Sequence, residues 1–269
     1  MDKPMELTSE VCRLVRSASE IMRIKPEHIR QKGNASDYVT EADVRVQEVL
    51  SKGLTEILPG SELCGEESDE HIVHDGDVWI VDPIDGTSNF IRDLGASVIS
   101  VGLMRHGELV SGVIYNPYRD EMFCAEKGCG AWLNGTRIHV SERDFAHSHF
   151  CTAMSVYDKS QAEACFSILR RVYYSCDDMR RFGAAAFELA QLAAGRVELY
   201  FEMRLCPWDC AAAAVLIEEA GGYWECLYQK GMPTDRRFVF LAANTKENFA
   251  RLRAVVTEEI PQIPYDPKL

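Results

Sequence analysis

Two aspartates separated by two residues follow a run of apolar side chains in the stretch Trp79-Ile80-Val81-Asp82-Pro83-Ile84-Asp85-Gly86. We expect the apolar run to form a buried strand that presents Asp82 at its carboxyl end. The chain should turn there, because proline fixes its own φ and glycine permits a positive φ. A turn would bring Asp85 beside Asp82, which a regular strand would not do at this spacing.

Two neighbouring carboxylates repel each other unless a cation lies between them. Magnesium suits such a pair, because it takes hard oxygen ligands and keeps room for water and for a substrate phosphate. The backbone N–H groups of Gly86, Thr87 and Ser88 would then lie at the start of a helix or tight turn, where a phosphate is well bound. The alternative is an Asx-turn with two capping aspartates and no metal.

Further carboxylates elsewhere in the chain favour the metal. Glu66 and Glu67 end a second apolar run, and Asp209 opens an alanine-rich segment. Each has an ordinary explanation by itself, because acidic residues are common in solvated loops and near helix N-termini. Together with the aspartate pair they predict a binuclear site of Glu66, Asp82, Asp85 and Asp209.

Helices and strands must position these side chains. Apolar residues at helical spacing predict helices over 7–22 and 40–58, the second with Thr40 as its N-cap. Short β-prone runs are expected at 98–103, 110–114 and 122–125. The later part of the chain alternates between helices, expected at 187–194 and 208–220, and strands, expected at 197–201 and 238–242. We therefore expect an α+β half followed by an α/β half.

The composition is typical of a globular protein. The 269 residues are 46% hydrophobic and 26% charged, and no run approaches the roughly eighteen apolar residues of a membrane span. The N-terminus lacks a secretory pattern, which favours a cytoplasmic location. The net charge of −13 argues against nucleic-acid binding. The ten cysteines lack the spacing of a disulfide scaffold or a zinc site.

The motifs, in their order and spacing, resemble the inositol monophosphatase family over nearly the whole chain. The resemblance rests on Gly65-Glu66-Glu67, Asp82-Pro83-Ile84-Asp85-Gly86-Thr87, Trp208-Asp209 before a helix ending Gly221-Gly222, Asp37 to Asp43, Tyr115-Asn116-Pro117 and Gly130 to Gly135. It implies a layered αβαβα sandwich in one domain, 1–269. The half at 1–145 would carry most metal ligands, and the half at 146–269 would carry Asp209 and the substrate contacts. It also implies a lithium-sensitive, magnesium-dependent phosphatase that assembles as a homodimer.

The resemblance also implies individual roles at the metals. Glu66, Asp82, the Ile84 carbonyl and Thr87 would hold one Mg²⁺; Asp82, Asp85 and Asp209 would hold a second; a third would bind near Glu66. Metal-activated water would then attack the phosphate in line. Thr87, backed by Asp43, would orient that water, although Asp43 also partly fits a capping box with Thr40. Lys32 aligns with a family lysine near the metals.

Substrate contacts are implied for Asp85, Gly86, Thr87, Ser88, Gly183, Ala185 and Glu202. Glu202 would accept hydrogen bonds from substrate hydroxyls, or it is the polar end of a strand. Ala184 replaces a family hydroxyl residue, which weakens an assignment to inositol itself. Arg180 and Arg181 are surface charges or approach a second anionic group, and Glu67 is a further candidate.

Several functions therefore remain open. The leading one is hydrolysis of inositol monophosphate or a related polyol or sugar phosphate. Alternatives within the superfamily are fructose-1,6-bisphosphatase, histidinol-phosphatase and 3′-phosphoadenosine 5′-phosphate phosphatase. A different class is a regulatory protein that binds the transcription machinery, as some bacterial members of this family do.

Overall fold

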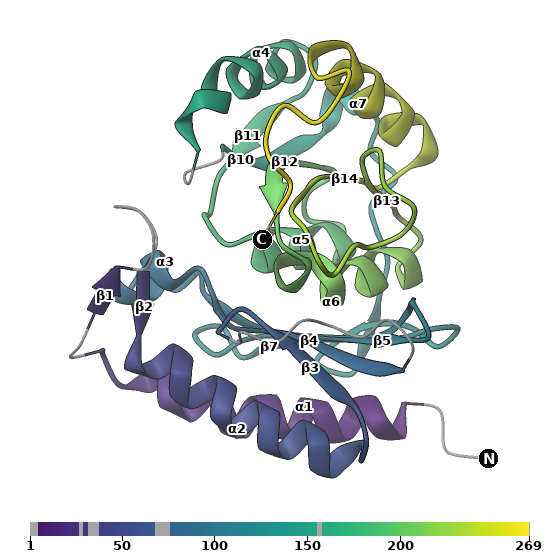
Figure 1. Ribbon diagram of the computed structural model, residues 1–269. Helices are drawn as coiled ribbons and strands as arrows, with labels where there is room; N and C mark the ends of the chain where they lie inside the picture. Colours follow the sequence, from purple (N-terminus) through teal and green to yellow (C-terminus); the bar gives the residue numbers. More distant parts are fainter. Residues whose placement is uncertain (1–4, 27–28, 32–37, 68–75, 155–157, 269) are drawn as a thin grey trace.

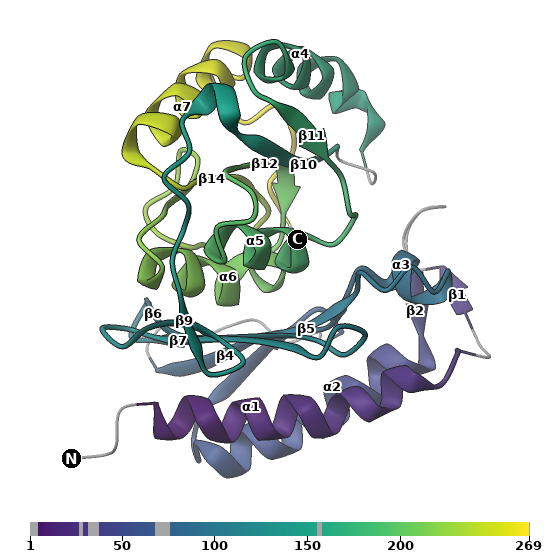
Figure 2. The same ribbon diagram turned by 180° about the vertical axis from the view of Figure 1, so that it is seen from behind.

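The computed structural model of the protein describes residues 5–26, 29–31, 38–67, 76–154 and 158–268. Its helices and strands form five layers, in which three pairs of helices alternate with two β-sheets (Figures 1 and 2). This arrangement confirms the layered αβαβα sandwich. The helix pairs are α1 (Glu6–Ala18) with α2 (Glu41–Ile57), α5 (Ala185–Ala193) with α6 (Pro207–Glu219), and α4 (Ala162–Tyr173) with α7 (Lys246–Glu259).

The first sheet has seven strands, and only its edge pair β3–β4 is parallel. Its strands in spatial order are β3 (Glu62–Gly65), β4 (Asp77–Asp85), β5 (Val98–Arg105), β6 (Glu108–Asn116), β7 (Glu121–Glu126), β8 (Gly130–Leu133) and β9 (Thr136–Ile138). The central strands β4, β5 and β6 are buried almost throughout, because helices cover both faces of this sheet.

The second sheet has five strands and mixes parallel with antiparallel pairs. In spatial order they are β11 (Asp178–Arg180), β10 (His149–Ala153), β12 (Leu199–Leu205), β14 (Phe238–Ala243) and β13 (Tyr223–Cys226). Strand β12 was expected to end at Phe201, but it continues to Leu205. Glu202 therefore lies inside a strand and not at its polar end.

Small elements join the layers. Strands β1 (Ile29–Gln31) and β2 (Tyr38–Thr40) form an antiparallel pair, and α3 (Thr87–Ile91) follows β4 directly. Three 3₁₀ turns lie at Ser19–Arg23, Phe145–His147 and Lys159–Gln161. No helix in the described part of the chain is long and apolar enough to cross a membrane.

Helix α2 begins and ends close to where the sequence predicts. The Thr40 hydroxyl accepts a hydrogen bond from the Ala42 N–H, and the Asp43 carboxylate accepts one from the Thr40 N–H at 2.8 Å. Both halves of a capping box are therefore present, which satisfies donors that the first turn leaves without intrahelical partners. The cap fixes Asp43 at the end of α2 that faces α3.

Helix α6 lies unusually close to the first sheet. Gly102 in β5 and Gly112 in β6 are paired neighbours, and α6 crosses them at Ala211 and Ala212. A Cβ atom on Gly112 would stand 2.2 Å from the Ala212 carbonyl oxygen, and one on Gly102 would stand 3.0 Å from the Ala212 nitrogen. Glycine in the strands and alanine in the helix thus let the two backbones touch.

Candidate metal-binding active site

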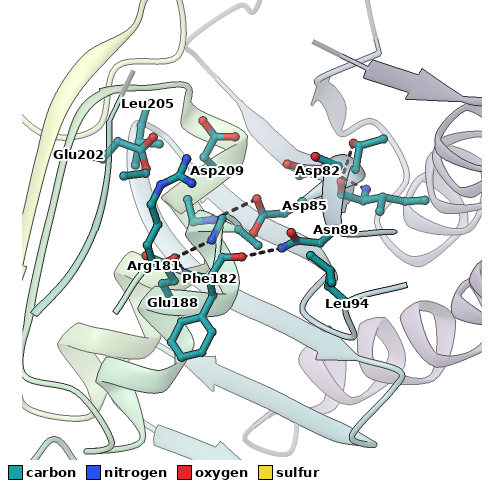
Figure 3. Close-up of a pocket in the computed structure, with 18 of the residues that line it drawn as sticks. Asp82, Asp85, Asn89, Leu94, Arg181, Phe182, Glu188, Glu202, Leu205 and Asp209 are labelled. Atoms are coloured by element: carbon teal, nitrogen blue, oxygen red, sulfur yellow. Dashed lines mark hydrogen bonds between the residues drawn. The ribbon is translucent and has the colours of Figure 1, made fainter. Parts of the chain in front are cut away.

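A cavity of 480 Å³ lies where β4, α3, β12 and the N-terminal ends of α5 and α6 meet. Figure 3 shows acidic side chains from both halves of the chain facing it. Most of the residues expected at the site line this cavity: Glu66, Asp82, Ile84, Asp85, Gly86, Thr87, Ser88, Arg181, Gly183, Ala185, Glu202 and Asp209. Segments that are more than a hundred residues apart in the sequence therefore form one site.

The aspartate pair is brought together differently from the prediction. Strand β4 does not end at Asp82; it continues through Pro83 to Asp85. Asp82 pairs with Ser100 and Asp85 with Val98, so β4 has one residue more than β5 between these two positions. Side chains three residues apart on a regular strand point to opposite faces, and one inserted residue returns the second to the face of the first. A β-bulge and not a turn places Asp85 beside Asp82.

Asp82 lies in the most negative environment of the site. Its side chain is almost fully buried and accepts a hydrogen bond from the Ile84 N–H at 3.0 Å. Burial raises the pKa of Asp82 well above its usual range, and the charges of neighbouring carboxylates raise it further. Those carboxylates belong to Glu66, Asp85, Asp209 and Asp43. A cation among them would relieve both the burial cost and the repulsion.

Asp85 joins the first sheet to helix α5. Its two carboxylate oxygens accept hydrogen bonds from the N–H groups of Ala185, Ala186 and Phe187 at 3.1, 2.8 and 3.3 Å. These are donors of the first turn of α5, which has no side-chain cap of its own. Burial raises the pKa of Asp85 to about 7, while the three N–H groups act in the opposite direction. Ala185 thus contacts a proposed metal ligand through its backbone.

Asp209 lies in the first turn of α6, as predicted. Its carboxylate accepts a hydrogen bond from the Cys206 N–H at 2.7 Å and so caps the helix, while Pro207 occupies the first turn, where no intrahelical N–H is needed. Burial raises the pKa of Asp209 to about 7, and the charge of Asp85 acts in the same direction. The cap and the close contact of α6 with the sheet hold this carboxylate at the cavity.

Thr87 and Asp43 lie in contact, as the resemblance implies. The Thr87 hydroxyl is 3.2 Å from an Asp43 carboxylate oxygen and 3.1 Å from the Ile84 carbonyl. Asp43 is fully buried behind Thr87 and does not itself line the cavity. Burial raises the pKa of Asp43, and the hydrogen bonds from Thr40 lower it. The capping role and the contact with Thr87 therefore coexist in one carboxylate.

The donors at this site suit a hard divalent cation. Carboxylates, a backbone carbonyl and a hydroxyl are the ligands that Mg²⁺ prefers. Among the described residues, no group of three or more acidic, thiol or imidazole side chains stands ready to hold a metal ion. Asp85 and Asp209 are instead turned toward backbone N–H groups. The donors fit Mg²⁺ by their chemistry and by their common position around one cavity.

On the wall of the cavity formed by β12, Glu202 accepts a hydrogen bond from a neighbouring side chain. The Tyr200 hydroxyl donates to a Glu202 carboxylate oxygen at 2.6 Å, and burial raises the pKa of Glu202 well above its usual range. Arg204 lies two residues further along β12 and also lines the cavity, because alternate strand residues share a face.

The remaining candidates divide between the cavity and its surroundings. Arg181 lines the cavity, and its side chain extends toward Glu202 and Asp209 (Figure 3). Arg180 does not line it and forms an ion pair with Asp178 in β11. Glu67 lies next to Glu66 outside the lining, where its N–H donates to the Gln47 side chain at 3.2 Å. Lys32 lies outside the described residues.

Glu188 is a site residue that sequence reasoning missed. It is only 1% exposed, lines the cavity, and accepts hydrogen bonds from the N–H groups of Phe182 and Gly183 at 2.5 and 2.9 Å. Its second carboxylate oxygen has no hydrogen-bond partner among the described residues. Burial raises the pKa of Glu188 to about 7. The sequence did contain one signal that could have identified Glu188, because it is the single acidic residue in the apolar segment 184–194.

Comparisons with known proteins show the family to which the chain belongs. The model of the inositol monophosphatase family matches residues 4–260. The chain is 40% identical over 194 residues to Nus factor SuhB of Salmonella typhimurium, covering 71% of this chain and 72% of that one. It is 35% identical over 251 residues to inositol-1-monophosphatase of Rhizobium meliloti, covering 92% of both.

A solved structure gives the same result for the fold. The extragenic suppressor protein SuhB of Bartonella henselae matches with a TM-score of 0.85 at 32% identity, over 94% of this chain and 99% of that one. This chain belongs to the inositol monophosphatase family.

Proposed function

We propose that this protein hydrolyses a small phosphomonoester in a magnesium-dependent reaction. The observation that carries the proposal is the convergence of Glu66, Asp82, Asp85 and Asp209 from three separate parts of the chain onto one cavity. Burial and the repulsion among these carboxylates raise the pKa of Asp82 and make the cluster costly without a cation. Family membership supports a phosphatase, and members of the family depend on magnesium.

Two Mg²⁺ ions would be held by the carboxylates. Glu66, Asp82, the Ile84 carbonyl and Thr87 would hold the first; Asp82, Asp85 and Asp209 would hold the second; a third would lie near Glu66. When bound, the ions supply an activated water and neutralise the charge that develops on the phosphate and the leaving oxygen. The β4 bulge supports this assignment, since it places Asp82 and Asp85 on one face.

The chain's own residues would orient the attacking water. Thr87 can donate a hydrogen bond to Asp43, at 3.2 Å, which leaves hydroxyl lone pairs to accept a hydrogen bond from water. Asp43 is fixed by the two hydrogen bonds from Thr40, so the Thr87 hydroxyl has a defined orientation. The backbone at Gly86 and Ser88 would lie against the phosphate.

The substrate would be inositol monophosphate or a related polyol or sugar phosphate. Glu202 supports this choice, since the Tyr200 hydroxyl bonds one of its oxygens and the other can accept from a substrate hydroxyl. Gly183 and Ala185 would border the same space. Arg181 would allow a second phosphate group to bind, as in the alternative substrates fructose-1,6-bisphosphate and 3′-phosphoadenosine 5′-phosphate. Histidinol phosphate, with a single phosphate, is the third alternative. We also propose lithium sensitivity and assembly as a homodimer.

The test is phosphate release in magnesium buffer from inositol-1-phosphate and the three alternative substrates. The result expected is turnover that disappears on chelation of Mg²⁺ and is highest with inositol-1-phosphate. Lithium addition and the mass of the protein in solution test the other two properties. Absence of turnover on every substrate, with magnesium binding shown by calorimetry, would contradict the proposed activity.

A second role is favoured by the name of the 40% identical relative, Nus factor SuhB. We propose regulatory binding to the transcription machinery in addition to catalysis, as the family resemblance suggests. The test is direct binding of the purified chain to RNA polymerase, measured for the native protein and for Asp82→Asn. Binding by both proteins with hydrolysis by only one would separate the two roles, and binding by neither would exclude the second.

A further inference from the structure

Three sulfur atoms lie together in the interior of the protein. They belong to Cys210 in α6, Cys226 at the end of β13 and Met232 in the segment between β13 and β14. The Met232 thioether sulfur is 3.8 Å from the Cys210 sulfur and 3.7 Å from the Cys226 sulfur. Burial raises the pKa of Cys210 well above its usual range, and a charge on the nearby Cys226 would raise it further. The three side chains thus form one group, which we call the sulfur cluster.

The distances from the Met232 sulfur to the two cysteine sulfurs are close to those between ligands of a single metal ion. A bond between a first-row metal ion and a thiolate is about 2.3 Å long, so three sulfurs in a plane around the ion are about 4 Å apart. The two observed separations, 3.7 and 3.8 Å, are only slightly shorter. Small adjustments of side chains would open the cluster, and methionine is the most adaptable apolar side chain.

The sulfur cluster borders on a cavity, which close packing of core side chains does not require. A second cavity of 210 Å³, lined by different residues from the carboxylate cavity, reaches Met232. Its wall carries three glutamates, Glu108, Glu218 and Glu219, and one lysine, Lys127. The excess of negative charge favours the entry of cations. Both cysteines are buried behind the methionine, at 0% and 2% exposure.

We propose that Cys210, Cys226 and Met232 form a binding site for one soft monovalent cation, of which copper(I) is the main candidate. Thiolate and thioether sulfurs are ligands that copper(I) prefers over harder metals. Zinc would lack the third and fourth strong ligands of a structural site. Binding breaks two S–H bonds, forms three metal–sulfur bonds, two to thiolates and one to the thioether, and releases two protons; the oxidation state of the metal does not change.

The test is an anaerobic titration of the metal-free protein with copper(I) in competition with a chromophoric copper(I) chelator. The native chain should withdraw one tightly bound ion, and X-ray absorption should show sulfur ligands only. Cys226→Ala and Met232→Leu should each weaken this binding by more than about tenfold, because even residues that only support metal ligands contribute that much. Met232→Leu conserves volume, so it removes the ligand while keeping the packing.

Cys165→Ala is the matched control. Cys165 is also fully buried, but it belongs to the core between α4 and α7. This variant should bind copper(I) like the native chain, and circular dichroism should show all three variants folded. Equal affinity in the native chain, Cys226→Ala and Met232→Leu would overturn the proposal, as would X-ray absorption with nitrogen or oxygen ligands. A loss as large in Cys165→Ala would overturn it as well.

Discussion

Asp82 and Glu202, on different walls of the carboxylate cavity, differ in the groups that surround them. On the wall formed by β4 and α6, Asp82 has one hydrogen-bond donor and several carboxylate neighbours. On the wall formed by β12 and α5, Glu202 is bonded by Tyr200 and Glu188 by two backbone N–H groups. In the proposed function, the first wall would hold the cations that carry the chemistry, and the second would orient the hydroxyl groups of the substrate. Substitutions on the first wall should therefore act mainly on catalysis, and substitutions on the second wall mainly on substrate choice.

Asp82→Asn should have the largest effect. Loss of a metal ligand should lower kcat/KM by at least about a hundredfold. The metal-free variant should be more stable than the native chain at neutral pH, because burial and neighbouring carboxylates raise the pKa of Asp82 and so disfavour its charged form in the folded state. Asparagine keeps an oxygen for the Ile84 N–H. Phosphate release and urea unfolding measure both effects, and a less stable variant would contradict the repulsion.

The stability of the metal-free protein should fall as the pH rises from about 4 to about 7. Asp85, Asp209 and Glu188 have pKa values raised to about 7 in the folded chain, against about 4 when unfolded. In that window the folded state binds more protons than the unfolded state, so the free energy of unfolding decreases with pH. Mg²⁺ should restore stability above pH 7. Thermal unfolding with chelator and with Mg²⁺ tests this, and a rise in stability over the window would contradict the pKa directions.

Glu202→Ala should act on substrate choice more than on chemistry. Loss of a charged hydrogen bond of about 1.5–3 kcal/mol corresponds to a decrease of roughly 10- to 100-fold in kcat/KM for a polyol phosphate. An aryl phosphate, which lacks the hydroxyls, should lose much less. Tyr200→Phe is the matched variant, because it removes only the hydroxyl that holds Glu202. Equal losses on both substrates would show that Glu202 acts on the metals instead.

Arg181→Ala should have the smallest effect with a monophosphate and a larger one with a bisphosphate. Arg181 lines the cavity, whereas Arg180 pairs with Asp178 outside it. Arg180→Ala is therefore the control, with kinetics expected to be unchanged. The measurement is the ratio of kcat/KM values for a bisphosphate and a monophosphate in both variants. An equal shift of this ratio by the two substitutions would exclude a specific role for Arg181.

The sequence predicts local features of the site well. Thr40 and Asp43 form the predicted cap, and Asp209 lies in the first turn of its helix, because both depend on residues close in sequence. The β4 bulge was not predicted, since it depends on pairing with β5 and no local residue enforces it. The different positions of Arg180 and Arg181 were also unpredictable. The two residues are identical and adjacent, and only the direction of the backbone decides which side chain points to the cavity.

The contact of α6 with Gly102 and Gly112 has a consequence for how the family can diversify. Because main chain meets main chain there, any side chain added at Gly102 or Gly112 would displace α6 and, with it, Asp209. Residues on β12 and α5 have no such restriction, since their side chains line the cavity. Single substitutions on the wall formed by β12 and α5 can therefore change the substrate preference without changing the spacing of the acidic cluster.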